Sequence, residues 1–340
     1  MKKYIKASTL FFALCIALPL SPAVSGAKPL TLTYSNFFPP THVQSRLAEA
    51  WCKEVGTRTE GRVQVQYFAG QTLTKAKQTY DAVVDGIADV GFSVFAYTRG
   101  KFPVIGAMDL PFGYPSGRVA TAVINDLYKN FKPKELRETE VMYLHGHGPG
   151  FIHTRGKAVK TLEDLKGMKI RCTGLAAEAV KALGGTPVAI PMPESYQSLQ
   201  KGVVDGCANP LEANKGWKIG EVLDYATVAY PAAYTTSFFV VMSKEKWNAI
   251  SPKDQEIIRQ INDEWSVRHG EAWDESDMAG IRFFMQNGNT VHGIDAKESE
   301  RWRKAVSPVL DKYRDNLNKK GIDGDAVMEF IGRSLKKYSS

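Results

Sequence analysis

Short apolar segments alternate with amphipathic ones along most of this chain, and the alternation predicts strands and helices in turn. Residues 30–34 and 63–68 show the two-residue period of strands, whereas residues 43–57 repeat their apolar positions at helical spacing. A second predicted helix, residues 75–84, leads into a buried strand at residues 88–93. Two such crossovers predict a parallel sheet with helices on its faces, and hence an α/β fold.

The same alternation returns in residues 161–214, where two predicted strands each lead to a polar side chain. One strand ends at Arg171 and the other leads to Asn209, with helices expected at residues 175–183 and 194–201. Ligands of parallel α/β sheets lie in the crevice at the carboxyl ends of the strands. Because a guanidinium matches a carboxylate with two parallel hydrogen bonds, we expect a carboxylic acid to bind here.

The second half of the chain contains an unusually long helical pattern. Ser251 and Pro252 form a strong helix start, and the pattern continues to residue 285 before Asn287 and Gly288 end it. A helix of this length spans about 50 Å, which is longer than one small domain. We therefore expect it to brace two lobes, with two further helices after it.

The N-terminal residues indicate that the protein is exported. Residues 1–27 read as a cleavable signal peptide, with Lys2, Lys3 and Lys6 followed by an apolar run too short for a membrane span. Loss of these three lysines lowers the net charge from +8 to +5. The remaining charges are interleaved along the chain, which indicates a mixed solvated surface and no nucleic-acid partner.

Cysteine and motif content narrow the chemistry without deciding it. Cys52, Cys172 and Cys207 remain after cleavage, so a Cys172–Cys207 disulfide and a pair of buried thiols are both open. The closely spaced His145 and His147 leave open an exported metal-dependent enzyme, although the sequence has no HExxH motif. It also has no nucleophile or phosphate-loop motif. A periplasmic ligand sensor is the third alternative.

Several segments together carry a family resemblance. In chain order, these segments are EGRVQVQYFAGQ, LPFGYPS, TLEDLKGMKIR, GVVDG with the NP after it, and ISPKDQEII. The same order is found in the DctP-type solute-binding proteins of tripartite ATP-independent periplasmic (TRAP) transporters, and the chain closely resembles these proteins. The resemblance implies a two-lobed α/β periplasmic binding protein fold, each lobe a mostly parallel sheet flanked by helices. Lobe I is expected to contain residues 28–150 and about 239–278, and lobe II residues 151–238 and about 279–340.

The resemblance also implies a function and a site. A small organic acid would bind between the lobes, with Arg171 holding its carboxylate and Asn209 beside it, and a membrane permease would receive it. Cys207 and Ala208 replace the family's usual Gln-Glu, and no second arginine occurs at residues 148–151, which favours a monocarboxylate. An aromatic acid and a 2-oxo acid both fit. No enzyme activity, cofactor or metal is expected. The aromatic residues expected either to line the cleft or to lie in the core are Phe37, Phe38, Phe92, Tyr97, Trp217, Tyr234 and Phe238.

Overall fold

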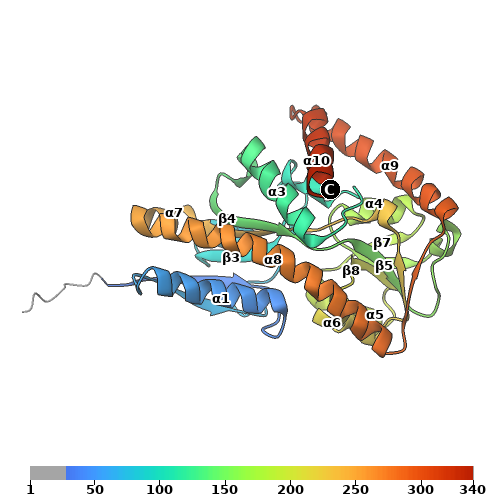
Figure 1. Cartoon of the computed structure of the whole chain (residues 1–340), viewed down its shortest axis with the longest axis horizontal. Coiled ribbons are helices and arrows are strands. Elements are labelled where there is room, and N and C mark those ends of the chain that lie inside the picture. The colour runs from blue at the N-terminus through green and yellow to red at the C-terminus, as the bar shows by residue number, and fades with distance from the viewer. Residues whose placement is uncertain (1–27, 340) are drawn as a thin grey trace, which may run out of the picture.

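The computed structural model describes residues 28–339, so the predicted signal peptide lies outside the described residues. Two sheets with helices packed around them form the molecule (Figure 1). The strands are β1 Leu30–Asn36, β2 Val63–Phe68, β3 Val90–Val94, β4 Thr139–Gly146, β5 Gly150–Thr154, β6 Lys169–Cys172, β7 Thr186–Ala189, β8 Gly206–Pro210, β9 Tyr225–Val228, β10 Ser237–Ser243 and β11 Thr290–Gly293. The α/β class predicted from the sequence is confirmed.

The helices include the long one that the sequence predicted. The α-helices are α1 Val43–Arg58, α2 Thr79–Val84, α3 Gly117–Phe131, α4 Ala176–Ala182, α5 Ser195–Gln200, α6 Ala213–Gly216, α7 Lys244–Ala249, α8 Pro252–Gln286, α9 Ala296–Lys319 and α10 Gly324–Ser339. Helix α8 contains 35 residues, and the Ser251 hydroxyl caps it by accepting the Asp254 N–H. It begins beside α1 and ends beside the second sheet, so it passes along both sheets (Figure 1).

The first sheet has the order β2-β1-β3-β10-β4, in which β1 pairs in parallel with β2 and β3. Strand β10 runs antiparallel between β3 and β4. The second sheet has the order β11-β9-β5-β8-β6-β7, in which β6 is parallel to β7 and β8, and β5 is antiparallel to β8 and β9. The carboxyl ends of β6 and β8 therefore lie side by side, as predicted for Arg171 and Asn209.

The chain passes between the two sheets more than once, and glycines allow the close contacts at these passages. Residues 147–149 join β4 to β5, and residues 229–236 lead from β9 back to β10. A Cβ atom on Gly148 would lie 1.9 Å from an oxygen of Asp277, and one on Gly280 would lie 2.0 Å from the Leu211 carbonyl oxygen. Helix α8 thus packs closely against the passage at Gly148 and against the backbone of the segment that follows β8.

Two helices are shorter in the structure than the sequence pattern predicts. The helix predicted at residues 75–84 begins only at Thr79, because the Gln71 side chain accepts the Ala76 N–H and holds the preceding residues in a turn. The sequence also predicts a helix at residues 217–223, whereas the structure has a single 3-10 turn there, Ile219–Glu221, since Lys218 has a left-handed backbone with a φ of 58°. Both differences arise from local backbone contacts that an apolar pattern does not encode.

The cores follow the sheets rather than the order of the chain. One cluster combines β1, β3 and α1 with Trp265 and Trp273 of α8. Another contains α3 together with Leu317, Val327 and Ile331, so α10 packs against α3 of the first sheet's layer (Figure 1). The sequence-based division had placed α10 with the second lobe. The residue boundaries of the lobes stay a prediction.

Candidate functional site

A small cavity of about 50 Å³ lies where the two sheets face each other, with walls from both. Of the eight residues predicted for the site, the seven that line it are Phe37, Phe38, Arg171, Asn209, Trp217, Tyr234 and Phe238. Phe92 lies one layer back, with its ring centroid 5.4 Å from that of Phe38. The structure therefore brings most of the predicted residues to one place, from segments as distant in the sequence as Phe37 and Phe238.

Aromatic rings form most of the cavity wall and meet across the two sheets. Phe37, which follows β1, stacks on Trp217 of the other layer at a centroid distance of 6.0 Å and an interplanar angle of 16°. The ring centroid of Phe238 on β10 lies 5.1 Å from that of Trp273 on α8. Such pairs contribute more than the burial of their area alone, so the wall is a firm apolar surface.

Arg171 is the one arginine or lysine among the described residues that line this cavity. Its side chain is almost fully buried, and its Nε donates a hydrogen bond of 2.8 Å to the Ile190 carbonyl. No acidic side chain within residues 28–339 forms an ion pair with it. A buried cation without an anion is unfavourable in a protein, which marks the Nη groups as a place for an external anion.

The positive charge of Arg171 contributes to the pKa values of Tyr97 and His147. Burial raises the pKa of Tyr97, and the guanidinium opposes that rise. Burial lowers the pKa of His147 to about 4, with a smaller contribution from Arg171, so this imidazole is neutral near pH 7. Arg171 is therefore the source of positive charge in the cavity wall.

The side chain of Asn209 contacts the His153 ring. The Asn209 amide nitrogen lies 3.4 Å from His153 Nδ1, while its carbonyl oxygen is buried without a hydrogen-bond partner among the described residues. Because β6 and β8 pair in parallel with Arg171 opposite Cys207, Asn209 lies two residues further along β8, toward the same edge of the sheet. Among the described residues, the cavity thus offers a guanidinium without an ion-pair partner beside an amide oxygen without a hydrogen-bond partner.

The histidines considered as metal ligands are engaged elsewhere. His145 is buried, and its Nδ1 accepts a hydrogen bond of 2.9 Å from the Trp273 indole. His147 lines the cavity, with its Nδ1 against the Gly148 carbonyl. Within the described residues, no group of three or more His, Cys, Asp or Glu side chains is arranged to hold a metal ion.

Cys172 and Cys207 lie on the adjacent strands β6 and β8 as buried free thiols. Burial raises the pKa of Cys172 to about 11 and that of Cys207 to about 12. Of the two alternatives that the sequence left open, the structure has the thiol pair.

Sequence reasoning missed several lining residues, which are Val94, Thr173, Met192, Pro210, Glu212, Ala213, Thr236 and Trp273. Thr173 and Pro210 adjoin predicted site residues, so their position after a strand could have indicated them. Trp273 lies in the middle of α8, where only the crossing of that helix over the cavity brings it in. No sequence pattern gives that crossing point.

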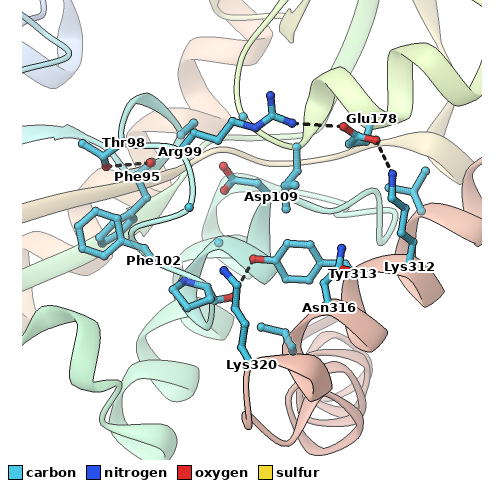
Figure 2. A pocket seen from close by; sticks show the side chains of 18 of the residues that line it. Phe95, Thr98, Arg99, Phe102, Asp109, Glu178, Lys312, Tyr313, Asn316 and Lys320 are labelled. Atoms are coloured by element: carbon cyan, nitrogen blue, oxygen red, sulfur yellow. Dashed lines mark hydrogen bonds and ion pairs between the residues drawn. The ribbon is translucent and has the colours of Figure 1, made fainter.

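A larger hollow of about 450 Å³ lies between residues 95–109, the start of α4 and helix α9 (Figure 2). Glu178 there joins Arg99 at 3.3 Å and Lys312 at 3.4 Å. Asp109 is buried at its wall and accepts hydrogen bonds from the Ser237 N–H and hydroxyl; burial raises its pKa to about 7, opposed by these bonds. The hollow contains none of the predicted ligand-binding residues.

Two facing α/β sheets with a charged, aromatic-walled cavity between them define a class of ligand-binding proteins with two lobes. The family model DctP, described as bacterial extracellular solute-binding protein family 7, matches residues 34–316. The chain belongs to this family, whose members are solute-binding proteins of TRAP transporters. Within residues 28–339, none of the helices combines the length and apolarity needed to cross a membrane.

Some relatives of known structure bind aromatic acids. A marine metagenome TRAP solute-binding protein specific for aromatic acid ligands, in complex with 3-hydroxybenzoate, is 26% identical with a TM-score of 0.88, covering 92% of this chain and 100% of that one. A TRAP protein from Bordetella bronchiseptica with bound (R)- and (S)-mandelate is 29% identical with a TM-score of 0.85, covering 91% and 100%. The C4-dicarboxylate-binding periplasmic protein DctP of Rhodobacter capsulatus is 25% identical over 322 residues, 91% of this chain and 93% of that protein.

Proposed function

We propose that this TRAP solute-binding protein captures a small aromatic monocarboxylate in the cavity between its lobes. Arg171 would hold the carboxylate, and Asn209 would contact it or a neighbouring polar group. The aromatic rings of both lobes would enclose the rest of the ligand. The protein would perform no chemistry on the acid and would deliver it to a membrane permease.

The buried guanidinium of Arg171 is the observation that carries this proposal. Its Nε is committed to the Ile190 carbonyl, while its positive charge has no acidic partner among the described side chains. A carboxylate would supply the missing negative charge and accept paired hydrogen bonds from the fork. Since the cavity is shielded from water, these bonds would be stronger than in solution.

Charge and shape favour an aromatic monocarboxylate over a dicarboxylate or a sugar acid. A second carboxylate would need a second cation, and the described wall offers Arg171 and a His147 that is neutral near pH 7. Phe37 and Trp217 line the cavity as a nearly parallel pair of rings, and an aromatic wall of this kind suits an aromatic ring better than a hydroxylated sugar. The 3-hydroxybenzoate and mandelate complexes of related proteins agree with this choice.

The position of the cavity suggests how ligand binding would be signalled. Because its walls come from both lobes, an acid can enter only when the lobes separate, and it contacts both only when they close. The ligand would therefore shift the open–closed equilibrium toward the closed form, which the permease would recognise. Cleavage after residue 27 would release the protein into the periplasm.

A thermal-shift screen of the mature protein tests the ligand class. Benzoate, 3-hydroxybenzoate and mandelate should each raise the melting temperature, since a ligand that binds only the folded state stabilises it. Benzamide, which keeps the ring but lacks the charge, and succinate, which carries two charges, should have little effect. Equal shifts with benzamide and benzoate would contradict the role of charge, and a larger shift with succinate would contradict the monocarboxylate.

A further inference from the structure

His42 and Glu212 form a buried pair that joins the two lobes beside the cavity. His42 precedes α1 in the layer of the first sheet, and Glu212 follows β8 of the second sheet. The His42 Nε2 lies 3.0 Å from Glu212 Oε2, although the residues are 170 positions apart. Both side chains are nearly inaccessible, at 1% and 4% exposure. Separation of the lobes would break this contact and hydrate both groups.

The hydrogen bonds around His42 define its protonation at the pair. His42 is the N-cap of α1, and its Nδ1 accepts the Gln44 N–H at 3.2 Å. A nitrogen that accepts a hydrogen bond carries no proton, so the ring proton of the neutral imidazole is on Nε2. Nε2 therefore donates to the Glu212 carboxylate, which makes this a charge-assisted hydrogen bond.

The surroundings of the pair are built for close approach. A Cβ atom on Gly216 would lie 2.5 Å from Glu212 Oε2 and 2.6 Å from His42 Nε2, so only glycine leaves room for the two groups. The ring centroid of His42 lies 4.4 Å from that of Phe38 and 5.7 Å from that of Trp217, and both of these aromatic residues line the cavity. The pair therefore lies in the same buried region as the proposed ligand site.

Helix α8 holds the Glu212 end of the pair in place. The Glu212 N–H donates a hydrogen bond of 2.7 Å to Asp277 Oδ1, and Asp277 is almost buried near the middle of α8. Asp277 also lies against Gly148 in the passage between the sheets. The Glu212 backbone is thus tied to the helix that runs along both lobes.

From this geometry we infer that His42 and Glu212 act as a latch that stabilises the closed arrangement of the lobes. The inference rests on the proposed function, because closure is the step that traps the acid. Ligand affinity includes the free energy of closing, so loss of the latch lowers the closed population and weakens binding by the same factor. Neither residue needs to contact the ligand for this effect.

Three variants separate the latch from a merely structural contact. Glu212→Ala removes the acceptor. His42→Asn keeps a preferred N-cap residue for α1 but is too short to reach Glu212. Glu178→Ala is the matched control, because it deletes exposed ion pairs with Arg99 and Lys312 that also join segments of the two sheets (Figure 2). Exposed pairs of this kind contribute little.

Closure can be measured directly by single-molecule energy transfer between two dyes, one on Lys53→Cys in α1 and one on Lys201→Cys after α5. Both positions are exposed, whereas the native thiols of the described residues are buried. In protein without ligand, Glu212→Ala and His42→Asn should each lower the closed fraction at least fivefold, and the double variant should lower it no further. Glu178→Ala should change it less than twofold. Equal closed fractions in wild type and Glu212→Ala would overturn the latch.

Binding of 3-hydroxybenzoate and chemical unfolding complete the test. Each latch variant should weaken binding at least fivefold, whereas unfolding of the ligand-free, open protein should show no coupling between His42 and Glu212 in a double-mutant cycle. Coupling of equal size in unfolding would show a contact that persists in the open form and would overturn the latch. A wild type that fails to bind the acid contradicts the proposed function, while the ligand-free closed fractions still decide the latch.

Discussion

The Arg171 side chain donates from Nε to the Ile190 carbonyl at 2.8 Å, which orients the guanidinium with its Nη groups free of any ion pair to the described acidic residues. The bond to Ile190 links β6 to the segment after β7, so the position of the cation is set by the second sheet itself. A guanidinium that is oriented in advance loses little freedom when it binds a carboxylate. The site is therefore prepared for an anion before the lobes close.

Replacement of Asn209 by aspartate should impair binding more than replacement by alanine. Aspartate would place a carboxylate next to Arg171 and supply internally the charge that the ligand is proposed to bring. We expect Asn209→Asp to weaken benzoate binding at least tenfold relative to wild type in isothermal titration calorimetry, about 1.4 kcal/mol or more. Asn209→Ala should lose less, and equal losses in the two variants would argue against Arg171 as the carboxylate anchor.

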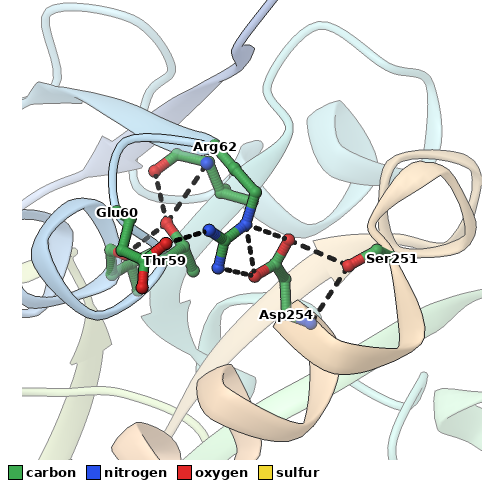
Figure 3. Close-up of polar contacts among 7 residues, drawn as sticks. Thr59, Glu60, Arg62, Ser251 and Asp254 are labelled. Carbon is green, nitrogen blue, oxygen red and sulfur yellow. Dashed lines mark hydrogen bonds and ion pairs between the residues drawn. The ribbon is translucent and has the colours of Figure 1, made fainter. Parts of the chain in front are cut away.

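The start of α8 predicts an acid-sensitive contribution to stability. Asp254 is buried and accepts hydrogen bonds from the Arg62 guanidinium and the Ser251 hydroxyl (Figure 3). The hydrogen bonds from Arg62 hold the pKa of Asp254 below its ordinary value, although burial opposes them. The stabilisation is present above the unfolded pKa, near 4, and is lost as the pH falls through the lower folded value.

Asp254→Asn should accordingly lower the free energy of unfolding at pH 7 by about 1–2 kcal/mol, since a hydrogen bond to a charged group is weakened by solvent around the 38% exposed Arg62 side chain. In urea titrations the difference from wild type should shrink as the pH falls below 4. Asp263→Asn, at an exposed position of the same helix, should have no such effect. A difference that stays constant down to pH 2 would show that the charge of Asp254 is not responsible.

Gly280 should be intolerant of the substitution that usually strengthens a helix. Alanine is preferred to glycine within helices by about 1 kcal/mol. At Gly280, however, the added Cβ would meet the Leu211 carbonyl at 2.0 Å, and backbone cannot move aside cheaply. Gly280→Ala should cost about 1–3 kcal/mol, the usual range for overpacking.

The matched control for Gly280 is Gly332 in α10, where an added Cβ meets nothing within 4 Å. Gly332→Ala should raise the melting temperature, while Gly280→Ala should lower it. Both values can be read from thermal unfolding followed by circular dichroism. A stabilising Gly280→Ala would show that α8 can shift relative to the segment at Leu211.

The three described cysteines should resist alkylation in the folded protein. Cys52, Cys172 and Cys207 are buried, and burial raises the pKa of each thiol, so little thiolate exists at pH 8. Mass spectrometry after iodoacetamide treatment without reductant should show none of them labelled in native protein and all three labelled in urea. A single label in urea would reveal a disulfide.

The sequence predicted those features that depend on local periodicity. Alternation of strands and helices predicted the α/β class. The Ser251-Pro252 start and the Asn287-Gly288 stop predicted α8 to within one residue of its observed end at Gln286. Arg171 and Asn209 were placed at the cavity because both follow strands of one parallel unit, and parallel strands end at the same edge. Their role in ligand binding stays a prediction.

Features that depend on how distant segments cross were not accessible from the sequence. Trp273 lines the cavity because α8 crosses it there, and the helical pattern alone gives no crossing point. The His42–Glu212 contact joins residues from two sheets, and α10 returns to pack on α3. Phe92 was one of several aromatics near a strand end, and its place behind Phe38 depends on side-chain packing.

Calorimetric titration of benzoate into the mature protein and its Arg171→Ala variant tests the central claim most directly. Lys169→Ala, which removes an exposed cation from the same strand, is the control. The account predicts that Arg171→Ala folds as wild type does and binds at least tenfold more weakly, a loss of about 1.4 kcal/mol or more, while Lys169→Ala binds normally. Unchanged affinity in a folded Arg171→Ala variant would contradict it.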